Sequence, residues 1–99
     1  MSVTIGSAGA GEVVIAIDGE LDLGNVAELE RKAAHVFEQP PPAVLVVDLS
    51  GLRFADSSAI ATLVRWSALV GELRLVSVSP LLRRVIQTMG LGEWLGMEA

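Results

Sequence analysis

The side chains best suited to chemistry are three consecutive polar residues, Asp56, Ser57 and Ser58. They open a segment with helical apolar periodicity, and we expect Asp56 or Ser57 to cap that helix. Two hydroxyls in the first turn are more than a cap needs, so one is left available. A phosphate attached there would face the positive end of the helix dipole. The pattern therefore permits two interpretations, a plain helix cap or a phosphate acceptor.

Catalytic and metal-binding arrangements find little support. His35 is the only histidine, and no GxSxG elbow frames Ser57 or Ser58. One imidazole, scattered carboxylates and no cysteine give no metal-ligand spacing. The glycines at 6, 9 and 11 imitate part of a phosphate loop, but they lack the Lys-Ser/Thr pair and precede a strand. We therefore expect no enzyme, no cofactor and no metal.

Composition limits the architecture and the class of partner. The chain has 99 residues, of which 52% are hydrophobic and 19% charged, which favours one packed domain over residues 1–99. A net charge of −5 argues against nucleic acid as the main partner. No apolar run approaches the roughly 20 residues of a membrane span, and no signal peptide is recognisable at the start. A cytoplasmic protein without membrane insertion is expected.

The elements that position the Asp-Ser-Ser triplet follow from periodicity and turn residues. Strands are expected at 3–5, 12–18, 43–49 and 73–78, and helices at 25–38, 57–70, 80–89 and, as a short turn, 93–97. The first two strands form a hairpin, and 50–55 is a loop. The continuous apolar run 43–49 suggests a central strand buried on both faces, including Val46. Alternating strands and helices predict an α/β fold with a mixed sheet of about four strands and three to four helices.

Local signals define the helix ends. Asn25 with Glu28 resembles a capping box, and Glu28 is spaced to pair with Lys32. Ser79 before a proline predicts another helix start, and Gly90 predicts a stop.

A contact surface is expected on the helix after the triplet. Its sheet-facing side would comprise Ile60, Leu63, Val64 and Ser67, and its second side Ser58, Thr62, Trp66 and Leu69, with Arg65 beside them. A tryptophan and a leucine beside a candidate switch residue suggest protein binding. If Trp66 instead packs under a loop, the surface would lie on the loops 22–25, which includes Asp22, and 50–56. Trp94 is expected in the core or in C-terminal packing.

The stretch DLSGLRFADSSAIATLV resembles the signature DLSGVxFxDSSGLGxLL of the STAS-domain anti-sigma-factor antagonists. IDGELDLGNVAELE upstream and LRLVSVSPLLRRVIQTMGLGEWL downstream are similar to two further family segments, in the same order. The resemblance covers about residues 12–95. This chain departs from the family pattern at Ala59 and Ala61, where glycines are usual, and at Gly71, which arrives about one turn early.

The resemblance implies a STAS-like fold and a phosphorylation-gated binding module. The residue matching the family's phosphorylated serine is Ser58, with Asp56 and Ser57 as its neighbours. The implied partners are an anti-sigma-factor serine kinase and a phosphatase for the phosphorylated form. Unphosphorylated, the domain would bind the kinase and release a sigma factor. Two other uses of the fold stay open, a scaffold subunit of a stress-signalling complex and a cytoplasmic accessory of a transporter.

Overall fold

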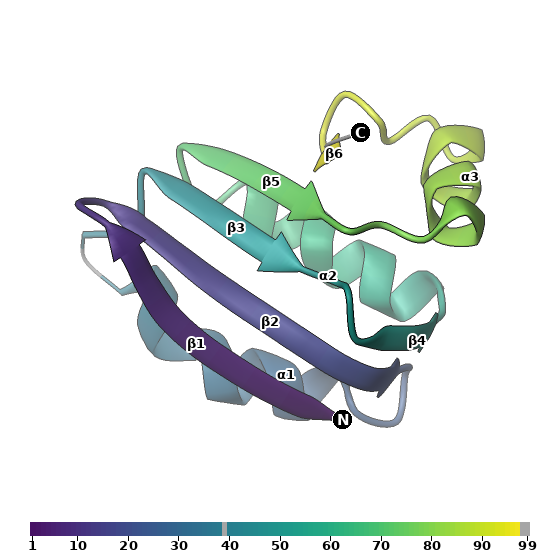
Figure 1. Cartoon of the computed structure of the whole chain (residues 1–99), viewed down its shortest axis with the longest axis horizontal. Coiled ribbons are helices and arrows are strands. Elements are labelled where there is room, and N and C mark those ends of the chain that lie inside the picture. Colours follow the sequence, from purple (N-terminus) through teal and green to yellow (C-terminus); the bar gives the residue numbers. More distant parts are fainter. Residues whose placement is uncertain (39, 98–99) are drawn as a thin grey trace.

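The computed structural model describes residues 1–38 and 40–97. Its elements are β1 (Ser2–Gly9), β2 (Glu12–Leu21), α1 (Val26–Ala33), the short 3-10 helix η1 (Ala34–Phe37), β3 (Val44–Asp48), β4 (Leu52–Ala55), α2 (Ser57–Ser67), β5 (Glu72–Val76), α3 (Pro80–Thr88) and β6 (Gly96–Met97). The strands form one sheet in the order β1-β2-β3-β5-β6, and β4 pairs with the end of β2 (Figure 1). Only β1 runs antiparallel to its neighbour. The predicted α/β class is confirmed, as is the central place of β3.

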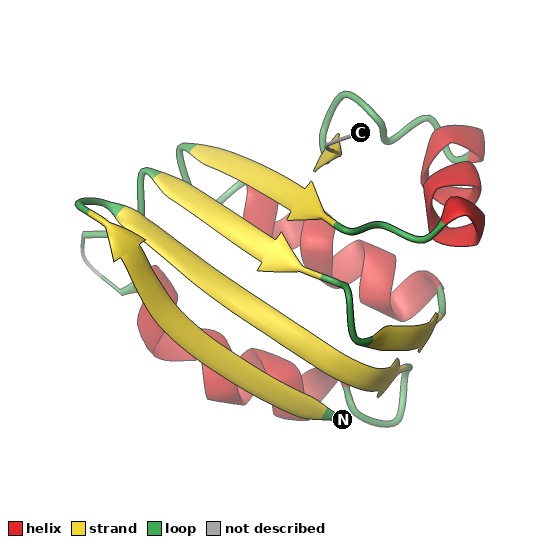
Figure 2. Ribbon diagram, in the orientation of Figure 1, coloured by secondary structure: helices red, strands yellow, loops and turns green. Residues whose placement is uncertain are grey.

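Both α1 and α2 lie on the same face of the sheet, whereas α3 lies beyond the end of β5 (Figure 2). Strand residues that face the helices are fully buried, as the side chains of Ile15, Val47 and Leu75 show. Val46 points to the opposite face and is only half-buried. The prediction that β3 is buried on both faces is therefore wrong, because the described helices cover only one face. No helix within residues 1–38 and 40–97 is long and apolar enough to span a membrane.

The sheet contains two strands that the sequence did not predict. β4 occupies the expected loop 50–55 and pairs in parallel with β2 at Gly19, Glu20 and Leu21. β6 takes the last two residues of the expected helical turn 93–97 and pairs with β5, and a hydrogen bond from the Leu95 N–H to the Leu91 carbonyl (3.0 Å) closes a turn just before it. β2 reaches Leu21 rather than ending at Asp18, and this extension supplies the backbone groups that β4 pairs with.

The helix boundaries are partly as predicted. The Ser79 hydroxyl accepts a hydrogen bond from the Leu82 N–H (3.2 Å), and Gly90 adopts a positive φ of 73° after α3, as expected. Helix α2 ends at Ser67 rather than near residue 70. Trp94 is 65% exposed, so its prediction as a packing residue is wrong.

Candidate functional site

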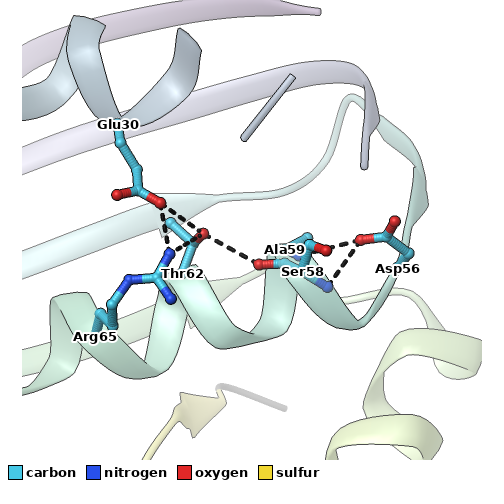
Figure 3. A network of polar contacts seen from close by, with 6 residues as sticks. All are labelled: Glu30, Asp56, Ser58, Ala59, Thr62 and Arg65. Carbon is cyan, nitrogen blue, oxygen red and sulfur yellow. Dashed lines mark hydrogen bonds and ion pairs between the residues drawn. The ribbon is translucent and has the colours of Figure 1, made fainter. Parts of the chain in front are cut away.

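Asp56 is the N-cap of α2 and the anchor of the site. Its Oδ1 accepts hydrogen bonds from the N–H groups of Ser58 (2.9 Å) and Ala59 (3.2 Å) (Figure 3). Its Oδ2 accepts a third bond from the Leu23 N–H (3.1 Å). One carboxylate thus satisfies two of the unpaired donors at the start of α2 and fixes the β2–α1 loop beside it. The sequence left the choice between Asp56 and Ser57 as the cap open, and the structure selects Asp56.

Because the Asp56 side chain caps α2, neither serine side chain is needed as the cap. Ser57 is exposed and Ser58 is half-buried at the first turn of the helix. Among the residues that the structure describes, neither serine hydroxyl has a hydrogen-bond partner. The first turn of α2 therefore presents two hydroxyls beside a fixed carboxylate.

The β2–α1 loop is held by its own side chains. The Asp22 carboxylate accepts a bond from the Gly24 N–H (2.8 Å), and the Asp22 N–H donates to the Asn25 side-chain oxygen (2.9 Å). The Asn25 amide nitrogen in turn donates to the Glu20 carbonyl (2.8 Å). The predicted capping box is wrong, because Asn25 makes no side-chain cap to α1 and is used to close this loop. The expected ion pair between Glu28 and Lys32 is present at 3.2 Å.

Thr62 connects α2 to α1 one turn after Ser58. Its buried hydroxyl lies 3.1 Å from the Ser58 carbonyl and 3.3 Å from Glu30 Oε1, to either of which it can donate. Arg65 Nη2 donates to the Thr62 hydroxyl (3.0 Å) and forms an ion pair with Glu30 (Figure 3). Thr62 is therefore a structural link between the two helices, and the prediction that it contributes to an exposed docking face is wrong.

The position of Trp66 also contradicts the docking stripe predicted on α2. Its side chain is only 3% exposed, and its ring centroid lies 5.3 Å from that of Phe37 in η1. Arg65 is exposed and Leu69 is 51% exposed, but the stripe that joined them to Ser58 is interrupted by two buried residues. With Trp66 buried, the expected position of the contact surface is the loops 22–25 and 50–56.

Exposed apolar side chains gather at the end of the sheet where those two segments meet. Leu23 is 76% exposed, and its N–H bonds to Asp56. Phe54, at the end of β4, is 51% exposed. Neither was singled out from the sequence, because a single leucine in a loop and a phenylalanine in a four-residue strand carry no periodic signal. Both are exposed and close to Asp56, Leu23 through its hydrogen bond and Phe54 through the chain, so we take them as the apolar part of the candidate site.

No group of three or more His, Cys, Asp or Glu side chains in residues 1–38 and 40–97 is placed to hold a metal ion. His35 is exposed on η1, and Ser57 and Ser58 stand at the start of α2. What the arrangement offers is a fixed helix start, two available hydroxyls and an apolar rim.

The mixed sheet carries α1 and α2 on one face, and α2 begins at a capped turn with two serines, which places the chain among small α/β domains. The family model "Mlab, STAS domain" matches residues 6–97, and the chain belongs to the STAS-domain family. The family predicted from the Asp-Ser-Ser segment is thereby confirmed.

Two relatives identify the branch of the family to which the chain is similar. The anti-sigma F factor antagonist of Lysinibacillus sphaericus is 33% identical over 87 residues, covering 84% of this chain and 74% of that protein. The anti-sigma-F factor antagonist RsfB of Mycobacterium tuberculosis is 36% identical over 86 residues, covering 84% and 70%. The chain therefore belongs with the anti-sigma-factor antagonists, which act by binding and not as enzymes.

Solved structures agree in fold. The anti-sigma factor antagonist SpoIIAA in its unphosphorylated form superimposes with a TM-score of 0.79 at 26% identity, covering 99% of this chain and 89% of that one. An anti-sigma factor antagonist from Mycobacterium paratuberculosis gives a TM-score of 0.84 at 25% identity, covering 97% and 83%. A sulfate transporter family protein from Wolinella succinogenes, at 22% identity and a TM-score of 0.71, shares the fold alone.

Proposed function

We propose that this chain is a cytoplasmic anti-sigma-factor antagonist whose binding to an anti-sigma-factor serine kinase is switched off by phosphorylation of Ser58. The observation that carries the proposal is the division of tasks in the first turn of α2. Asp56 makes all the cap bonds, so the Ser58 hydroxyl is available without loss of the helix. SpoIIAA, a protein of the same fold, has structures in an unphosphorylated and a phosphorylated form.

Unphosphorylated, the partner surface would consist of the Ser58 turn with the β2–α1 loop and the end of β4. Leu23 and Phe54 supply exposed apolar area for a partner to bury, and the Asp22 loop is held rigid beside them. Rigid loops lose little conformational entropy on binding. Arg65 and Leu69 lie further along α2 and form the outer margin of this surface.

Transfer of the terminal phosphoryl group of ATP to the Ser58 oxygen would release ADP and the hydroxyl proton. The product carries about −1.5 to −2 charges at pH 7. Asp56 is fixed at the same helix turn, and the chain already has 12 acidic residues against 7 basic ones. Like-charge repulsion and the desolvation of a phosphate then weaken the interface, and the kinase is released. A phosphatase restores the binding form.

Ser57 is the alternative acceptor, and exposure alone favours it, since Ser57 is exposed and Ser58 half-buried. The resemblance to the family motif supports Ser58. The purified chain is therefore incubated with its cognate kinase and ATP, and the phosphate is mapped by mass spectrometry in the parent, Ser58→Ala and the matched control Ser57→Ala. We expect phosphate on the parent and on Ser57→Ala only.

Affinity for the kinase is then measured by titration calorimetry. The phosphorylated parent is expected to bind at least about tenfold more weakly than the unphosphorylated parent, and Ser58→Ala to bind like the latter under all conditions. Phosphate mapped to Ser57, or equal affinity of both forms, contradicts the proposed switch.

A further inference from the structure

A hollow lies between β4 and the start of α3, at the same end of the sheet as the candidate site. Its volume is about 160 Å³. Six of the side chains that line it are Leu52, Arg53, Phe54, Ser79, Leu81 and Val85. Apolar cavities of about 150 Å³ are large enough for a benzene ring. The hollow therefore has room for one phenylalanine or leucine side chain of a partner.

The apolar surface continues outside the hollow, along α3. Leu81 is 72% exposed, Val85 is 37% exposed, and Met89, one turn later, is 49% exposed. These three residues are spaced four apart and so follow one side of the helix. Together with Phe54, which lines the hollow, they extend the exposed apolar surface from the hollow along α3, and we call this surface the groove. Exposed apolar surface of this continuity is typical of protein-binding sites.

The charged side chain that lines the hollow is basic, although the chain as a whole is acidic. No acidic side chain is among the described residues that line the hollow, although the chain carries 12 acidic and 7 basic residues. Arg53 lines the hollow and is exposed. Arg84 is exposed on α3, three residues after Leu81, so the two are neighbours on the helix surface. An apolar hollow lined by one guanidinium group, with a second exposed arginine on the adjacent helix, is complementary to an apolar side chain flanked by carboxylates.

We propose that the β4–α3 groove, formed by the hollow and the Leu81–Val85 side of α3, binds an acidic segment of a partner protein through one phenylalanine or leucine anchor. The anchor fills the hollow, and flanking Asp or Glu side chains pair with Arg53 and Arg84. β4 leads directly into Asp56, so this groove continues the surface around Ser58. Binding here requires neither phosphorylation of Ser58 nor the identity of the partner as a kinase.

The test uses three blocked hexapeptides and the isotope-labelled chain. The probe is Glu-Glu-Leu-Phe-Glu-Glu, the charge control is Lys-Lys-Leu-Phe-Lys-Lys, and the anchor control is Glu-Glu-Ala-Ala-Glu-Glu. Binding is followed by changes of backbone amide signals in nuclear magnetic resonance spectra. We expect saturable changes at 52–55 and 81–85 with the probe, at a Kd of about 1 mM or below, and at least tenfold weaker binding of both controls.

Variants of the chain separate the groove from general electrostatics. Arg53→Glu is expected to weaken binding of the probe peptide by about tenfold or more, because it places like charges together. The matched control Arg31→Glu makes the same charge change on exposed α1 and should leave probe binding within twofold. Val85→Glu should abolish binding without changing the thermal unfolding midpoint, since Val85 is outside the core.

Ser58→Ala should bind the probe like the parent, so a failure of the phosphorylation switch and a failure of the groove are seen separately. Equal binding of the acidic and basic peptides, signal changes away from 52–55 and 81–85, or equal effects of Arg53→Glu and Arg31→Glu would each overturn the proposal. No saturable change with the probe up to several times the expected Kd overturns it as well.

Discussion

Replacement of Trp66 by alanine distinguishes a core residue from an interface residue. The Trp66 side chain is 3% exposed and packs against the Phe37 ring at a centroid distance of 5.3 Å. Truncation of a buried tryptophan to alanine costs about 3–5 kcal/mol of unfolding free energy, part of which is the lost ring pair. A domain of this size has a total stability of about 5–15 kcal/mol. We therefore expect Trp66→Ala to lose a large fraction of the stability.

The expected loss is measured by urea unfolding followed by far-ultraviolet circular dichroism. At about 4–8 °C per kcal/mol for a domain of this size, the thermal midpoint should fall by at least about 12 °C. Leu69→Ala is the matched control on the same helix, since Leu69 is 51% exposed and its truncation should change stability by less than about 1 kcal/mol. The double variant with Phe37→Ala should lose less than the sum of the two single losses, because both remove the same ring contact.

Kinase binding completes the test. Where Trp66→Ala is still folded, it should bind the anti-sigma-factor kinase within about threefold of the parent, because a buried ring offers no area to a partner. A Trp66→Ala chain that keeps its stability within about 1 kcal/mol but binds tenfold more weakly would refute the placement of this ring in the core.

Two further changes test the frame of the site. Asp56→Ala removes the acceptor of two α2 N–H groups and of the Leu23 N–H, and it should lower the unfolding free energy measured in urea by about 1–2 kcal/mol. Asp56→Asn keeps an acceptor and should lose clearly less. Equal losses for the two variants would contradict the capping role. Val47→Asp places a charge in the fully buried face of β3 and should lower the unfolding free energy by more than about 3 kcal/mol. Val46→Asp lies on the half-buried face and should lower it by less. The reverse order would contradict the faces assigned to these two residues.

Local sequence signals were sufficient for the strands of the central sheet. β2, β3 and β5 are rich in β-branched or aliphatic residues and are bounded by turn residues, so each was predicted from its own composition. β4 was missed because four residues directly after a glycine turn are too few for a clear strand signal, and β4 depends on the extension of β2 to Leu21, with which it pairs. A strand that depends on a partner elsewhere in the chain is not visible in a local window.

Which side of α2 is exposed could not be predicted from the sequence for a similar reason. Periodicity identifies apolar residues on a helix, but the width of the buried face depends on how many elements pack against it. Here the sheet lies on one side, and η1 with Phe37 lies on another, so the buried face extends round to Thr62 and Trp66. The site residues predicted from the motif, Asp56 and Ser58, are instead fixed by sequence-local hydrogen bonds, and the structure places them together at the start of α2.

The two alanines that differ from the family pattern have different consequences. The Ala59 methyl group is only 1% exposed and faces the core, so its effect is on helix propensity and packing and not on a partner. Ala61 is exposed and lies four residues after Ser57 and three after Ser58, which places its methyl group next to both hydroxyls on the helix surface. A partner that approaches Ser58 would contact the methyl group of Ala61 where the family pattern has none. Under the proposed function, Ala61 is therefore the departure that we expect to affect partner affinity.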